Sequence, residues 1–183
     1  EGLLIICTGK FTKKLDEYQS EEKEYTGTIT MGATTPSYDL ETAIDEEFPI
    51  DKLTKEDILA NCKHFIGDIE QIPPAHSAIK IDGERLYEKA RRGEEVTIKT
   101  RKITISEFEI TNIDLPNVDF RVVCTKGTYI RSLAYDFGKK LNNGAHLSKL
   151  TRTRSGSFNL TDAWQLDQLL TTIREIPLPP TNL

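Results

Sequence analysis

The sequence predicts an α+β fold, in which a mixed and largely antiparallel sheet is flanked by helices. Two observations carry this prediction. Several segments alternate apolar and polar residues with a period of two, which is typical of half-buried strands. Other segments between them repeat apolar residues at helical spacing, and tight-turn signals such as Asp82-Gly83 favour antiparallel hairpins. Strands and helices are interleaved along the whole chain, as expected of an α+β domain.

The clearest strand lies between Lys23 and Gly32. Tyr25, Gly27, Ile29 and Met31 share one face there, and three threonines occupy the other. Residues with branched β-carbons suit a pleated, half-buried surface. Further strands are expected at Leu3–Cys7, Ser77–Ile81, Val96–Ile113, Phe120–Cys124 and Leu150–Phe158.

The helices are marked by apolar spacing and by end signals. Thr54 to Asp57 forms a capping box ahead of an apolar repeat, which predicts a helix start. Tyr129 to Leu141 carries a stripe of apolar residues at helical spacing and is followed by Asn142-Asn143-Gly144, which ends helices. Shorter helices are expected at 8–18, 86–93 and 162–170.

A chain of 183 residues predicts one domain of ordinary size. We expect this domain to occupy residues 1–175, with a proline-rich tail at 176–183 and no appended RNA-binding domain. The chain opens directly on the apolar run Leu3 to Cys7, and natural chain ends seldom lie inside a core element. We therefore expect further sequence upstream of Glu1 in the parent protein.

The composition excludes several classes of protein. No apolar run approaches the ~20 residues that a membrane span needs. Cys7, Cys62 and Cys124 are far apart and odd in number, which argues against a disulfide framework and favours reduced thiols in the cytoplasm. The three histidines have no second ligand at metal-binding spacing, so we expect no metal site.

Charge is distributed unevenly along the chain. The whole protein carries −5, and residues 1–60 hold fourteen acidic and six basic side chains. Residues 121–158 instead hold eight basic side chains and one acidic side chain, Asp136. Chance clustering on a solvated surface is one interpretation. The other is a basic face for a polyanion, favoured by the aromatic and glycine residues between the cations.

The motif Lys126-Gly127-Thr128-Tyr129-Ile130-Arg131 lies where a strand passes into a helix. Gly127 permits an unusual backbone angle, and the helix start offers free N–H groups to an anion. An arginine supplies charge and an aromatic ring supplies a stacking face, the combination that binds nucleic acid with exposed bases. Taken alone, the motif also fits an ordinary strand-to-helix turn with a surface arginine.

Four other segments accompany this motif in order, and together they resemble one family. The set closely resembles the tRNA pseudouridine synthase B (TruB) family over Glu1 to about Leu170. These segments are Gly2-Leu3-Leu4 with Thr8-Gly9-Lys10, Lys23-Glu24-Tyr25, Gln71 to Lys80 with Gly83, Tyr87, Ala90, Arg91 and Gly93, and Gly144 to Leu147 with Leu150 to Gly156. The resemblance implies the family's catalytic-domain fold and isomerisation of uridine to pseudouridine in the T-arm of tRNA.

The resemblance also implies roles for individual residues. Tyr25 matches the tyrosine that stacks on the flipped base and assists proton transfer, and Arg131 matches the arginine that pairs with the catalytic aspartate. Tyr129 and Leu150 match residues of the uracil pocket, although a core role in a strand is the alternative for Tyr25 and Leu150. The cations that fall near bound RNA are Lys80, Lys126, Arg152 and Arg154.

One part of the family pattern lies outside this chain. The family's aspartate belongs to a segment resembling Gly-Thr-Leu-Asp-Pro-Leu-Ala, which would end just before Glu1. Asp16, Asp39 and Asp136 stand in other contexts, so we assign none of them this role. The chain by itself is therefore expected to be inactive. Thr151 also stands where many members carry arginine.

The resemblance further implies a cytoplasmic enzyme, expected to be a monomer, that acts on the tRNA T-arm without cofactor or metal. Two alternatives stay open. One is a non-catalytic RNA-binding module, and the other is a small-molecule enzyme whose basic face binds a nucleotide. Tritium release from C5-labelled tRNA separates the synthase from the module. The salt dependence of tRNA binding separates both from the small-molecule enzyme.

Overall fold

The structure, a computed structural model, describes residues 1–81, 83–94 and 96–175. Its centre is a six-stranded sheet in the order β10-β9-β1-β8-β7-β4, and every pair of neighbouring strands is antiparallel. The predicted fold class is confirmed. The sheet strands are β1 (Lys23–Met31), β4 (Gly67–Gln71), β7 (Arg101–Asp114), β8 (Asn117–Cys124), β9 (Ala145–Ser155) and β10 (Phe158–Asn159).

Short elements surround this sheet. Two small ladders pair β2 (Ala33–Thr34) with β3 (Glu46–Glu47) and β5 (Lys80–Ile81) with β6 (Glu84–Arg85). The helices are η1 (Gly9–Lys14), α1 (Leu15–Ser20), α2 (Lys55–Asn61), η2 (Cys62–Phe65), α3 (Leu86–Arg91), α4 (Ile130–Lys140), η3 (Leu160–Asp162) and α5 (Leu166–Glu175).

The core lies between the sheet and the helices α2 and α4. Ile29 of β1 and Phe120 of β8 are almost fully buried, as are Ile58 of α2 and Phe137 of α4. Asn61 Nδ2 donates to the Phe137 carbonyl oxygen at 2.9 Å, which joins the two helices. The side chains of this core cluster are mostly aliphatic and aromatic, and the burial of their apolar surface holds α4 on the sheet.

The opposite face of the central strands is polar, as the alternation in β1 predicts. Thr28 Oγ1 donates to Asp119 Oδ1 at 2.6 Å, and Thr30 Oγ1 donates to Ser148 Oγ at 2.8 Å. Gly27 lies at a close crossing, where an added Cβ would overlap the Lys149 carbonyl oxygen. The apolar face of the sheet is therefore the one that packs against α4.

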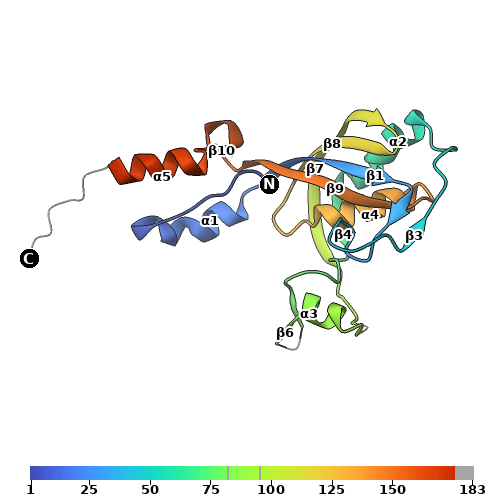
Figure 1. The fold of residues 1–183 in the computed structure, drawn as a ribbon, viewed down its shortest axis with the longest axis horizontal. Helices are drawn as coiled ribbons and strands as arrows, with labels where there is room; N and C mark the ends of the chain where they lie inside the picture. The colour runs from blue at the N-terminus through green and yellow to red at the C-terminus, as the bar shows by residue number, and fades with distance from the viewer. Residues whose placement is uncertain (82, 95, 176–183) are drawn as a thin grey trace, which may run out of the picture.

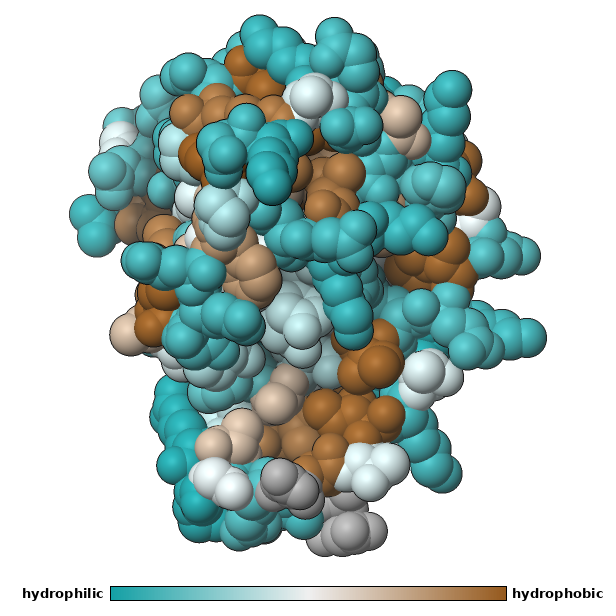
Figure 2. Space-filling view, turned by 90° about the vertical axis from the view of Figure 1, so that its right-hand side faces the viewer, coloured by the Kyte–Doolittle hydropathy of each residue, from teal (hydrophilic) through white to brown (hydrophobic). Residues whose placement is uncertain are grey.

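Two parts project from this body (Figure 1). An arm contains α1 and α5, and neither helix has a buried residue. Tyr18 of α1 packs edge-on against Phe158 of β10 in the arm. A lobe that contains β5, β6 and α3 hangs below the sheet, and Figure 2 shows apolar side chains gathered on this lower lobe beneath a largely hydrophilic surface.

The N-terminal strand prediction is wrong. Leu3 is buried, but Leu4 and Ile6 are 71% and 68% exposed, and Leu3–Cys7 forms no strand. Only an isolated bridge joins Gly2 to Arg152, beside a bond from Leu3 N to the Arg152 carbonyl oxygen. Apolar composition indicates a tendency to be buried, whereas a strand also requires a neighbouring backbone to complete its ladder.

Other predicted elements hold with shifted bounds. β9 begins at Ala145, five residues before the predicted start, and α5 begins at Leu166 instead of residue 162. Within Val96–Ile113, the strand begins only at Arg101. β4 went unpredicted because Gly67–Gln71 alternates over too few residues. The tail at 176–183 and the turn residue Asp82 lie outside the described residues.

Within the described ranges, no helix combines the length and apolarity needed to cross a membrane.

Candidate active site

The start of α4 is held in place by a glutamine from another strand. Tyr129 is the N-cap of α4, and its side chain makes no capping bond. Gln71, at the end of β4 and 2% exposed, instead binds the backbone of Tyr129 itself. Its Oε1 accepts from Tyr129 N at 2.8 Å and its Nε2 donates to the Tyr129 carbonyl oxygen at 3.0 Å. Ser132 Oγ also donates to the Ile72 carbonyl oxygen at 2.7 Å.

Arg131 projects from this fixed helix end towards two loops. Its Nη1 lies 3.1 Å from Asp39 Oδ2 and 4.0 Å from Glu41 Oε2. Its Nη2 donates to the His76 carbonyl oxygen at 2.9 Å, and Nη1 makes a long bond of 3.5 Å to the Ser37 carbonyl oxygen. The side chains of Arg131 and Asp39 are only 22% and 25% exposed, so their attraction is weakly screened by solvent.

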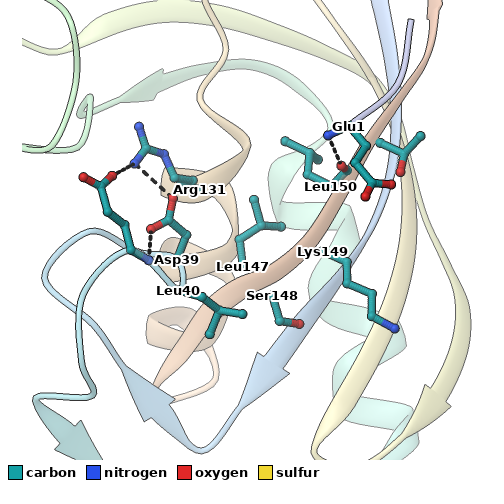
Figure 3. Close-up of a pocket in the computed structure, with 10 residues that line it drawn as sticks. Glu1, Asp39, Leu40, Arg131, Leu147, Ser148, Lys149 and Leu150 are labelled. Carbon is teal, nitrogen blue, oxygen red and sulfur yellow. Dashed lines mark hydrogen bonds and ion pairs between the residues drawn. The ribbon is translucent and has the colours of Figure 1, made fainter. Parts of the chain in front are cut away.

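An open pocket of about 740 Å³ lies beside this ion pair. Figure 3 shows Asp39 and Arg131 at one end of it and Glu1 with Leu150 at the other, with Leu147 between them. Its lining combines the apolar side chains Leu40, Leu147 and Leu150 with the charged pair. Concave pockets with apolar walls and a few directed polar groups are the usual form of small-molecule sites.

Tyr25 lies on β1 between Val122 of β8 and Arg152 of β9, and it packs against the core. Tyr25 borders a second hollow, of about 510 Å³. The structure therefore places Arg131 and Leu150 in one pocket and Tyr25 in a separate hollow, and Tyr129 lines neither of them. The second hollow is basic, because Lys23, Arg101, Lys102 and Lys126 border it.

Burial raises the pKa of the Tyr25 hydroxyl, and the nearby Cys124 thiol raises it further, while Arg152 opposes both effects. The phenol therefore stays protonated at neutral pH. Burial also raises the pKa of the Cys124 thiol to about 11, so this thiol stays neutral and unreactive. The interpretation of Cys62 and Cys124 as buried reduced thiols fits their positions, whereas Cys7 is only partly buried.

The four cations implied for RNA contact are spread over the molecule. Lys126 is exposed beside the Tyr25 hollow, and Lys80 is exposed in the lower lobe. Arg152 Nε donates to the Leu3 carbonyl oxygen at 2.8 Å, and Arg154 Nη1 donates to the Gly156 carbonyl oxygen at 3.1 Å. Both arginines therefore also hold backbone in place.

Not every cation of the basic stretch is available to a polyanion. Arg121 Nη2 lies 2.6 Å from Glu107 Oε2, and its Nε lies 3.2 Å from Glu24 Oε2. Those carboxylates come from β7 and β1, on either side of β8. The positive charge counted along the sequence is partly neutralised across strands.

Sequence reasoning left two site residues without a role. Asp39 was set aside, yet it is the carboxylate that meets Arg131. Its 92-residue separation from Arg131 leaves no periodic signal in the sequence. Gln71 belonged to a recognised segment, but its part in holding the start of α4 appears only when β4 and α4 are placed together.

No group of three or more histidine, cysteine, aspartate or glutamate side chains in the described part of the chain is arranged to hold a metal ion. The polar residues that line the Arg131 pocket are Arg131 and Lys149, three carboxylates, and the hydroxyl residues Ser148 and Thr151. Such groups direct protons and charge on a bound substrate.

Two family models together match residues 1–176. Residues 1–130 match the N-terminal domain of the TruB family pseudouridylate synthases, and residues 131–176 match the tRNA pseudouridylate synthase B C-terminal domain. The boundary between them falls at Arg131, inside α4. The first matched region contains β1 with Tyr25, and the second contains β9 with Leu150.

Curated relatives agree with these matches. A tRNA pseudouridine synthase B of Flavobacterium johnsoniae is 61% identical over 162 residues, covering 88% of this chain and 71% of the relative. The synthase of Phocaeicola vulgatus is 50% identical over 91% of this chain and 71% of its own length. That of Clostridium tetani is 44% identical over 92% of this chain and 58% of its own length.

A solved structure shares the fold. A chain of the structure titled "Crystal Structure of a Cbf5-Nop10-Gar1 Complex" aligns with a TM-score of 0.63 at 29% identity, over 86% of this chain and 37% of that chain. Taken with the α4 and β9 geometry and the matching relatives, this establishes that the chain belongs to the TruB family of pseudouridylate synthases.

Proposed function

We propose that the parent protein isomerises uridine to pseudouridine in the T-arm of tRNA, at position 55. The observation that carries this proposal is the Arg131 guanidinium, held by Asp39 and the His76 carbonyl oxygen at the edge of a pocket lined by Leu147 and Leu150. Family membership and the relatives named tRNA pseudouridine synthase B support pseudouridine formation in tRNA as the reaction. We further propose that the protein acts as a cytoplasmic monomer.

The reaction rearranges one nucleotide without adding or removing atoms overall. The bond from N1 of uracil to C1′ of ribose breaks, the base turns, and C5 joins C1′. The proton on C5 then passes to a carboxylate that acts as general base, and N1 takes up a proton from solvent, so no redox partner is needed. The base must first leave its stack in the folded RNA, which requires a pocket that offers stacking and hydrogen bonds in return.

Named residues supply these needs. Leu150 forms a wall of the base pocket. The family resemblance assigns Tyr129 to the same pocket and the Tyr25 ring to stacking on the flipped base, although neither side chain lines the Arg131 pocket in this structure. The Tyr25 phenol, kept neutral by its burial, assists the proton transfer at C5 by donating a hydrogen bond to the carboxylate that takes this proton. Arg131 keeps a catalytic carboxylate ionised and directed, because a close guanidinium favours the charged form of a carboxyl group. We infer that this carboxylate belongs to an Asp-Pro-Leu-Ala segment ahead of Glu1.

Tritium release from tRNA labelled at C5 of uridine tests the proposal. We expect the parent protein to release one tritium per tRNA, and the isolated 183-residue chain to release none. The parent protein with its upstream aspartate changed to asparagine serves as the matched control. A parent protein that binds tRNA without releasing tritium would leave the non-catalytic RNA-binding module as the better hypothesis.

We expect tRNA binding to weaken steeply with salt, which tests the interpretation of the cations. If Lys80, Lys126, Arg152 and Arg154 each contact a phosphate, the slope of log affinity against log salt is about −3 to −4. Lys126→Ala is expected to reduce the magnitude of this slope by about one unit. Lys55 is an exposed lysine on α2, and Lys55→Ala is expected to leave the slope unchanged. Filter binding at several salt concentrations measures the slope, and a flat dependence favours a small-molecule enzyme.

A further inference from the structure

The loop that carries Asp39, residues 35–42, is ordered by its own polar groups. Thr35 Oγ1 donates to the Asp39 carbonyl oxygen at 2.7 Å, and Ser37 Oγ donates to the same oxygen at 3.2 Å. Glu41 N donates to Asp39 Oδ1 at 2.9 Å, which fixes the carboxylate oxygen that Arg131 does not use. We call residues 35–42 the Asp39 loop. Its internal bonds define its shape but leave open how it is held against the rest of the protein.

Tyr38, next to Asp39, connects the loop to the body of the protein. Its φ is +63°, in the left-handed region that a tyrosine rarely adopts. Tyr38 N donates to the Thr35 carbonyl oxygen at 3.0 Å, and Leu147 N of β9 donates to the Tyr38 carbonyl oxygen at 2.9 Å. An unfavourable backbone angle persists when surrounding contacts determine it, and such angles gather at functional sites.

The side chain of Tyr38 stacks on Tyr135 of α4. The ring centroids are 4.1 Å apart and the planes are inclined by 19°. Tyr135 is four residues after Arg131 in the same helix, so the two side chains lie on one face of α4, one turn apart. Helix α4 therefore contacts the Asp39 loop at two points, through the Arg131–Asp39 ion pair and through the stacked rings of Tyr38 and Tyr135.

We propose that Tyr38 and Tyr135 are positioning residues, whose stacked rings hold the Asp39 loop on α4 and thereby fix the direction of the Arg131 guanidinium in the pocket. This inference rests on the proposed synthase function. Neither ring has to touch the uridine. The stacked rings position Asp39, and Asp39 in turn positions Arg131. The orientation of Arg131 relative to the reacting carboxylate must be precise for catalysis.

Single-turnover tritium release by the parent protein tests the inference. We expect Tyr135→Ala to lower the rate about tenfold while the tRNA dissociation constant changes less than about twofold. Tyr135→Phe keeps the stacked ring and is expected to retain the wild-type rate. Tyr18→Ala is the matched control, because it removes another aromatic pair, Tyr18–Phe158, in the arm. Tyr135→Leu repeats the test should Tyr135→Ala fail to fold in a thermal melt.

A double-mutant cycle separates positioning from general loss of packing. In an Asp39→Asn background the stack has no ion pair to position, so adding Tyr135→Ala should slow the rate less than about twofold further. Rate losses that multiply would overturn the inference, and so would a wild-type rate for both Tyr135→Ala and Tyr135→Leu. A wild-type protein without tritium release overturns the proposed function and the inference together.

Discussion

The variant Arg131→Ala is expected to lower the single-turnover rate of pseudouridine formation by about 100- to 1,000-fold. The guanidinium is fixed by Asp39 and by the His76 carbonyl oxygen, and it holds charge beside the pocket. Without it, the catalytic carboxylate loses the partner that favours its ionised form. The tRNA dissociation constant is expected to change less than about threefold, because the donors of Arg131 bind protein groups.

Two controls isolate this effect. Arg174→Ala removes an exposed cation in the last turn of α5 and should leave the rate unchanged. Arg131→Lys keeps the charge but loses the planar fork, so we expect an intermediate rate. Because Arg131 also joins two loops, each variant needs a thermal melt beside the rate measurement. Unchanged turnover by a folded Arg131→Ala protein would remove Arg131 from the active site.

Changes at Tyr25 are expected to separate its two proposed roles. Tyr25→Phe keeps the ring for stacking and removes the hydroxyl, so we expect a loss of about 100-fold in tritium release with little change in tRNA affinity. Tyr25→Leu removes the aromatic face as well, and should also weaken binding because base stacking is lost. Tyr18→Phe and Tyr18→Leu, in the arm, are the matched controls.

The pH dependence gives an independent check on Tyr25. Burial raises the pKa of its hydroxyl, so the neutral phenol persists above the ordinary value of about 10. If the neutral phenol is the active form, the rate holds through neutral pH and falls only as pH rises past that raised pKa. A fall of the wild-type rate near pH 8 that disappears in Tyr25→Phe would contradict this assignment.

Elements with strong local periodicity were predictable from the sequence. The alternation between Lys23 and Gly32 specified β1 and its two faces, because successive side chains of a strand point to opposite sides. The capping box at Thr54 specified the start of α2, where Thr54 Oγ1 accepts from Asp57 N. The motif from Lys126 to Arg131 specified a strand-to-helix junction, and α4 begins at Ile130.

Elements that depend on a neighbour were not predictable in this way. Leu3–Cys7 has the composition of a buried strand but makes only an isolated bridge at Gly2. β4 is short, and it forms a strand because its backbone pairs with β7. A strand exists only where a second backbone completes its hydrogen bonds, and local sequence does not say which backbone that is.

The sequence by itself determined the kind of protein: an α+β domain with a basic motif at the start of a helix and five ordered segments of the TruB family. Only the tertiary structure decided what surrounds that motif. It set Asp39 against Arg131 across 92 positions, stacked Tyr38 on Tyr135, and separated the Tyr25 hollow from the Arg131 pocket. Periodicity records which face a side chain takes on its own element, whereas the partner of a charge depends on how distant elements pack.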